Sequence, residues 1–79
     1  MAAFTEEDFR LASQCKGPYD NLPGNVADAA VKVAGSVEAI ARDEGVSQSQ
    51  AELIFCERHK HLGFYYSVVN RCVTYDREF

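Results

Sequence analysis

The hydrophobic pattern of the sequence is clearest between residues 26 and 44, where it predicts a long helix. The apolar side chains recur at steps of three and four residues, which places them on one face of an α-helix. They are Val26, Ala30, Val33, Val37, Ile40 and Ala41. Asn25 precedes this stripe as a good N-cap residue, and Gly45 follows it as a typical left-handed residue after a helix end. The pattern therefore predicts a helix over about 26–44 that buries one apolar stripe.

A shorter helix is predicted before it, over about 5–16. Thr5 is a good N-cap, and Asp8 stands three residues later, so the two residues can form a capping box. Phe4 and Phe9 occupy the two positions of a hydrophobic staple at the same helix start. Acidic residues in the first turn also favour a helix there, because they face the positive end of the helix dipole.

A third helix is predicted over about 48–62. Ser47 and Gln50 have the spacing of a capping box at its start, and Gly63 is expected to end it. Since only Val46 separates Ser47 from the glycine that ends the preceding helix, the two helices are expected to meet at a tight turn.

The pattern changes after residue 63, and the change predicts a β-hairpin. Residues 64–69 and 72–76 are rich in aromatic and β-branched side chains, which strands prefer. Asn70 and Arg71 between them fit a two-residue turn. We therefore expect an α+β fold in which three helices pack with a C-terminal hairpin. The last strand carries few charges, so a second copy of the chain could pair with its edge, which predicts a homodimer.

The length of 79 residues predicts one small domain over 1–79, with the turn-rich segment 17–24 as a connection inside it. A chain this short buries only about 60–65% of its unfolded surface, which leaves little room for an enclosed catalytic pocket. Eight Lys and Arg against twelve Asp and Glu give a net charge of −4, which argues against a general nucleic-acid or membrane binder. No apolar run is long enough to span a bilayer, and the N-terminus lacks the features of a signal peptide. We expect a non-enzymatic protein of the cytoplasm.

The cysteines and histidines predict neither a disulfide framework nor a metal site. Three cysteines are an odd number, which favours reduced thiols in the cytoplasm. Cys56 and His59 share a helical face, but His61 points away from it. Cys15 and Cys72 lack the paired spacing of zinc ligands. We therefore expect no metal, no catalytic residue and no cofactor.

Residues 41–47 have the pattern of a helix–turn–helix. Ala41 is followed four residues later by Gly45, and an apolar residue comes next. The second helix would then present Gln48 and Gln50, and glutamine can read adenine in the major groove. The same pattern also fits an ordinary helical hairpin closed by a glycine. Acidic residues around the turn argue against the phosphate contacts that DNA binding needs.

The acidic residues divide into those with a local partner and those without one. Three acid–base pairs stand four residues apart on the predicted helices, namely Glu6–Arg10, Asp28–Lys32 and Glu38–Arg42. Asp43 and Glu44 have no such partner and lie in the last turn of a helix, where carboxylates oppose the dipole. With Glu52 across the turn, they can form an acidic surface that binds Lys or Arg of a partner. A surface that only keeps the protein soluble explains the same three residues.

The whole chain resembles the phage-encoded anti-CRISPR proteins. It is similar in particular to small inhibitors of type I-C CRISPR–Cas systems, in its Ala- and Val-rich second helix and in the run FCERHKH from Phe55 to His61. The resemblance implies a stoichiometric inhibitor that binds the Cascade surveillance complex in the cytoplasm of a bacterial host and prevents capture of target DNA. Asp43, Glu44 and Glu52 would then act as a DNA mimic on Lys and Arg sites that otherwise hold phosphates.

Two other classes of protein compete with this interpretation. A small helix–turn–helix transcriptional regulator would use the turn and the glutamines described above. A structural protein of a phage particle would use the edge of the predicted hairpin.

Overall fold

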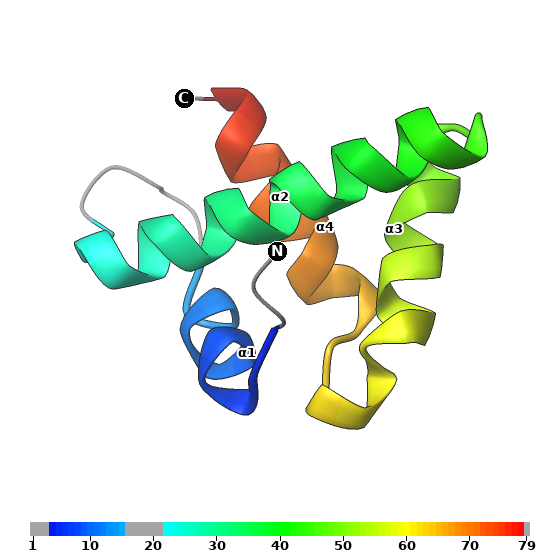
Figure 1. Cartoon of the computed structure of the whole chain (residues 1–79). Coiled ribbons are helices and arrows are strands. Elements are labelled where there is room, and N and C mark those ends of the chain that lie inside the picture. The colour runs from blue at the N-terminus through cyan, green and yellow to red at the C-terminus, as the bar shows by residue number, and fades with distance from the viewer. Residues whose placement is uncertain (1–3, 16–21, 79) are drawn as a thin grey trace.

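The computed structural model describes residues 4–15 and 22–78, and all regular elements of this described part are helices. The elements are α1 (Glu6–Ala12), α2 (Gly24–Glu44), α3 (Gln48–Arg58), the 3-10 helix η1 (Lys60–Leu62) and α4 (Tyr66–Glu78). The long helix α2 crosses the molecule, and α1, α3 and α4 all pack against it (Figure 1). None of the helices in residues 4–15 and 22–78 combines the length and the hydropathy that a membrane-spanning helix requires.

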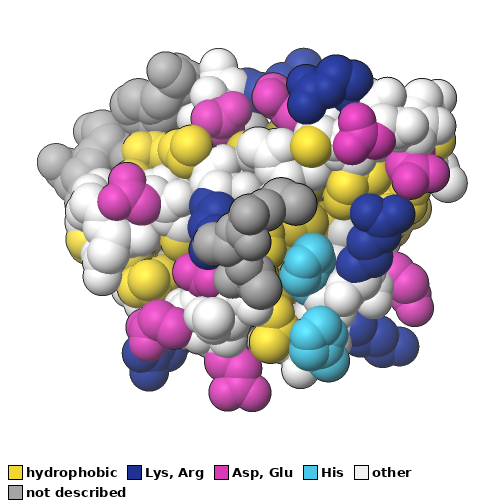
Figure 2. All heavy atoms as spheres, viewed as in Figure 1, with side chains coloured by type: hydrophobic (Ala, Val, Ile, Leu, Met, Phe, Trp, Pro, Cys, Tyr) yellow, Lys and Arg dark blue, Asp and Glu magenta, His cyan; other side chains and the backbone are white. Residues whose placement is uncertain are grey.

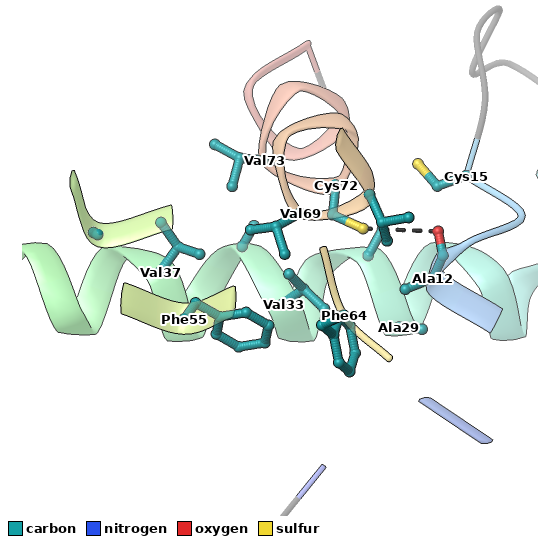
Figure 3. Packing of buried hydrophobic residues seen from close by; sticks show 14 of the residues in the cluster. Ala12, Cys15, Ala29, Val33, Val37, Phe55, Phe64, Val69, Cys72 and Val73 are labelled. Carbon is teal, nitrogen blue, oxygen red and sulfur yellow. Dashed lines mark hydrogen bonds between the residues drawn. The ribbon is translucent and has the colours of Figure 1, made fainter. Parts of the chain in front are cut away.

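The core lies where the apolar stripe of α2 meets α3 and α4. Val33 and Val37 of α2, Phe55 of α3 and Val69 of α4 are all fully buried, and their side chains converge in Figure 3. Ala30 is also fully buried in the stripe, so the apolar face predicted for the long helix is confirmed. Burial of these side chains is the main source of the fold's stability, because a small domain has few other apolar contacts.

An aromatic cluster extends the core toward the N-terminus of the chain. The rings of Phe4 and Phe9 both pack edge-on against Phe64, at centroid distances of 5.8 and 5.2 Å. Phe4 also meets Phe55 of α3 edge-on at 5.2 Å. Edge-to-face packing of this kind adds to the free energy gained by burial alone. The cluster therefore joins the start of α1 to α3 and to the segment before α4.

The predicted C-terminal β-hairpin is wrong, and so is the α+β fold class. Residues 64–69 and 72–76 were expected as strands, but α4 occupies most of this stretch. The buried residues of α4 follow helical spacing, and they are Val68, Val69, Cys72 and Val73. No strand occurs among the residues that the structure describes, so the strand edge that suggested a homodimer or a phage scaffold is absent there.

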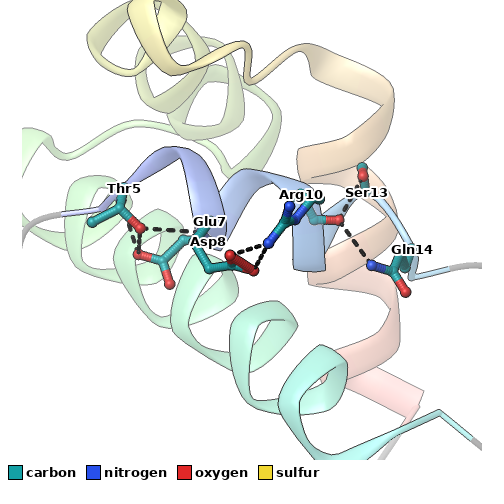
Figure 4. Close-up of polar contacts among 6 residues, drawn as sticks. All are labelled: Thr5, Glu7, Asp8, Arg10, Ser13 and Gln14. Atoms are coloured by element: carbon teal, nitrogen blue, oxygen red, sulfur yellow. Dashed lines mark hydrogen bonds and ion pairs between the residues drawn. The ribbon is translucent and has the colours of Figure 1, made fainter.

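The predicted start of α1 is confirmed, and its predicted end is not. Thr5 and Asp8 form the capping box, with the Asp8 backbone N–H donating to Thr5 Oγ1 at 3.2 Å and the Thr5 N–H donating to Asp8 Oδ2 at 2.9 Å (Figure 4). The helix ends at Ala12 rather than at residue 16. Residues 16–21, which hold most of the predicted connection 17–24, lie outside the described part.

The ends of the other helices differ from the prediction in two places. Helix α2 begins at Gly24 after Pro23, and Asn25 is inside the helix, where its own side chain accepts from the Val26 N–H. Helix α3 begins as predicted, with Ser47 Oγ accepting from the Gln50 N–H at 3.2 Å. It ends at Arg58, so the predicted span 48–62 is an α-helix followed by η1.

Candidate protein-binding surface

The turn between α2 and α3 positions the residues that the sequence singled out. Gly45 has φ 65° and ψ 39°, the left-handed conformation that glycine adopts without steric cost. Its N–H bonds back to the carbonyl of Ala41, and Ser47 then caps α3. The chain therefore reverses within three residues, as predicted, and brings the end of α2 beside the start of α3.

Asp43 and Glu44 are both exposed at this turn. Glu44 Oε2 lies 3.3 Å from Arg58 Nη2 of α3, and both side chains are about half-exposed. Asp43 makes no ion pair or hydrogen bond within the described part of the chain. Because an exposed ion pair contributes little to stability, the charge of Glu44 remains accessible to a partner. Asp43 offers an unpaired carboxylate beside it.

Glu52 does not join this surface, because α3 turns its side chain into the interior. Its relative exposure is 1%. Gln48 Nε2 donates to Glu52 Oε2 at 3.1 Å, and Asn70 Nδ2 of α4 donates to Oε1 at 3.1 Å. A buried carboxylate needs such partners, because removal from water is otherwise costly. The sequence therefore placed Glu52 wrongly on the exposed acidic surface.

The charge of Glu52 raises the pKa of two neighbouring side chains, Tyr66 and Cys56. It raises the pKa of the Tyr66 phenol, together with partial burial and a hydrogen bond to the same carboxylate. Burial raises the pKa of the Cys56 thiol, and the charge of Glu52 raises it further. Because the start of α4 thus lies against this part of α3, Tyr66 sits over the second and third turns of that helix.

An exposed surface with large apolar side chains lies around Tyr66. Ser49, Leu53 and Cys56 share one side of α3 by helical spacing, and Tyr66 also interacts with Ser49. Leu53 is 52% exposed and Tyr66 is 43% exposed, so both side chains leave apolar area open to solvent. We call these four residues the Leu53–Tyr66 surface. The sequence pattern does not predict this surface, because it places Tyr66 in a strand.

The surface charges are mixed in sign rather than gathered by type. Figure 2 shows acidic and basic side chains interspersed over one face of the molecule. The predicted pairs at a spacing of four residues are not formed, because Arg10 pairs with Glu7 (Figure 4) and Lys32 reaches Asp8 Oδ2 at 3.1 Å. Among the described residues, the acids of α2 therefore include unpaired carboxylates at Asp28 and Glu38 as well as at Asp43.

The histidine and cysteine residues considered for a metal have other neighbours. The ring of His59 stacks on Phe55 at 4.1 Å, and its Nδ1 lies 3.0 Å from the Phe55 carbonyl oxygen. No three His, Cys, Asp or Glu side chains converge on one point in residues 4–15 and 22–78. A surface hollow lined by Glu6, Glu7 and Arg10 holds an ion pair of its own.

Comparison with protein families, with curated proteins and with solved structures found no match to this chain.

Proposed function

We propose that this protein is a non-enzymatic anti-CRISPR protein that binds a type I Cascade complex and blocks its binding of target DNA. The proposal rests on the resemblance of the whole chain and on one structural observation: two exposed carboxylates, Asp43 and Glu44, at the tight turn between α2 and α3. A Cascade site that holds DNA phosphates presents Lys and Arg, which carboxylates bind through charge-assisted hydrogen bonds. The inhibitor would act in the cytoplasm of the bacterial host.

The Leu53–Tyr66 surface supplies the apolar contact that such a complex needs. Charged groups set the rate and orientation of association, whereas buried aromatic and aliphatic side chains contribute most of the affinity. Leu53 lies on α3, the helix that follows the turn carrying the acids, and Tyr66 lies at the start of α4. Glu52 is left out of the proposed contact, because its carboxylate is occupied by Gln48 and Asn70.

The test is the formation of a Cascade–DNA complex with purified type I-C Cascade. Preincubation with a stoichiometric amount of the protein should abolish retardation of a labelled target duplex. The variant D43K/E44K should lose at least about tenfold in inhibitory potency, since two attractive charges become repulsive. The matched control D28K/E38K makes the same change in net charge on exposed, unpaired acids of α2. Equal potency of the wild type and D43K/E44K would exclude the acidic turn, and absence of inhibition by the wild type would exclude the function.

A helix–turn–helix regulator is the second candidate, because the tight turn at Gly45 does join two helices. Its recognition helix would be α3, where Gln50 is exposed but Gln48 is held by Glu52. Retardation of DNA by the protein alone, at about 150 mM salt, would support this alternative. Such binding should weaken strongly as salt rises, because phosphate contacts release counterions.

A further inference from the structure

Two cysteines far apart in the sequence come together in the core. Cys15, after the end of α1, and Cys72, on α4, are both fully buried (Figure 3). The Cys15 thiol points to the carbonyl oxygen of Arg71, and the Cys72 thiol points to that of Ala12, each at 3.9 Å. The Cys15 thiol thus lies against the backbone next to Cys72, and the Cys72 thiol lies against the backbone three residues before Cys15.

The backbone around the two thiols is held in place by a further contact. Arg71 Nε donates to the carbonyl oxygen of Cys15 at 3.0 Å, which ties the segment after α1 to α4. The two thiols also lie close enough to affect each other's pKa. The third cysteine, Cys56, is on α3 and takes part in none of these contacts. The pair is therefore a specific arrangement of the fold.

We propose that Cys15 and Cys72 form an intramolecular disulfide when the protein meets a small-molecule disulfide such as oxidised glutathione. In the first step, the Cys15 thiolate attacks one sulfur of the oxidant, forms a mixed disulfide and releases one reduced thiol. In the second step, the Cys72 thiolate attacks the Cys15 sulfur and releases the second reduced thiol. The protein loses two electrons and two protons, and the oxidant gains them.

The order of the two steps follows from the surroundings of each thiol. Burial raises the pKa of Cys72 to about 12, and the neighbouring Cys15 adds to this effect. Burial also raises the pKa of Cys15, but the thiol of Cys72 acts in the opposite direction. The charge of Arg71 lowers the pKa of both thiols. Cys15 also lies just after a helix of seven residues, which opens more readily than the long core helices. Cys15 is therefore the attacking thiol and Cys72 the resolving one, and the reaction proceeds through opening at the end of α1.

The cross-link would fasten α1 to α4 and change the stability of the whole domain. Joining residues so far apart in sequence removes much of the conformational freedom of the unfolded chain. In a domain of this size, the melting temperature should rise by about 10 °C or more. This inference does not depend on the proposed partner, and its test uses no Cascade.

The experiment uses the full chain with C56S, which removes the thiol outside the pair. The protein is incubated with oxidised glutathione, and free thiols are then alkylated. Mass analysis should show loss of two hydrogen atoms from a monomer, and peptide mapping should join Cys15 to Cys72. The rise in melting temperature should disappear after dithiothreitol is added.

The controls are C15A/C56S and C72A/C56S, which keep one thiol of the pair and place an apolar methyl in the core. Neither should gain thermal stability with oxidised glutathione. The same mapping on the wild-type protein provides a measurement that needs no substitution in the core. If the wild type and C56S keep both thiols free, carry only glutathione adducts or form only covalent dimers, the proposal is wrong.

Discussion

Asn70 of α4 donates a hydrogen bond to a carboxylate that α3 buries, and 3.1 Å separates Asn70 Nδ2 from Glu52 Oε1. Gln48 supplies the second donor from one turn earlier on α3. This contact joins the two helices through a charged group, so each donor has a larger effect on stability than an exposed hydrogen bond would.

Replacing Asn70 by alanine should therefore destabilise the protein by about 1–3 kcal/mol, because the Glu52 carboxylate loses a donor while it stays buried. Urea unfolding measures the change. In a double-mutant cycle with E52A, the two losses should be markedly less than additive. Simple additivity would mean that the two side chains do not act together.

Protonation of Asp8 should weaken the start of α1 in acid. Burial alone would raise the pKa of Asp8, but hydrogen bonds from Lys32 and from the Thr5 backbone outweigh it and hold the pKa below its usual range. A carboxyl whose pKa is depressed in the folded state stabilises the fold above about pH 4, and this contribution is lost as pH falls through the folded pKa. Unfolding free energies measured between pH 7 and pH 3 should fall less for D8N than for the wild type. An equal fall in both proteins would contradict the role of Asp8.

Two glycines of α2 and its turn should respond to alanine in opposite directions. Gly45 has φ 65°, where a side chain is strained, so G45A should lose about 1–2 kcal/mol. Gly35 lies inside α2, and nothing within 4 Å would meet an added Cβ, so G35A should gain about 0.5–1 kcal/mol. Thermal melting of the two variants against the wild type tests the pair. Stabilisation by G45A would show that the turn does not require the left-handed conformation.

Alanine substitutions in the core should lower the free energy of unfolding much more than those on the proposed binding surface. Phe55 is fully buried on α3, so F55A should cost about 3–5 kcal/mol, a large share of the stability of a domain this small. Leu53 on the same helix is 52% exposed, so L53A should stay within about 0.5 kcal/mol of the wild type. Denaturant unfolding checks both values. If L53A unfolds as readily as F55A, then Leu53 belongs to the core and not to an accessible surface.

The C-terminal helix α4 shows that the strand propensity of individual residues predicts the wrong element when the spacing of the buried residues is not considered. Aromatic and β-branched residues favour strands, and on that basis residues 64–76 were assigned to a hairpin. The same stretch carries apolar residues at helical spacing, with Val69 and Val73 on the buried face of α4 and Tyr65 and Tyr66 exposed. The spacing of the apolar residues in this stretch indicates the helix. Burial of these residues against α2 outweighs a strand preference of a few tenths of a kcal/mol per residue.

By itself, the sequence determined the local features: the capping box at Thr5, the apolar stripe of α2, the reversal at Gly45 and the cap at Ser47. The two caps and the reversal each depend on residues within a few positions of one another, so the backbone conformation there follows from short-range sterics and hydrogen bonds. The stripe repeats at steps of three and four residues along a single helix, so it too can be recognised without the rest of the fold. Tertiary structure alone decided that Glu52 is buried, with Asn70 of another helix donating a hydrogen bond to its carboxylate. It also decided that Cys15 and Cys72 lie near each other in the core. These outcomes depend on which faces of distant helices pack together, and that choice is made by burial of the whole core.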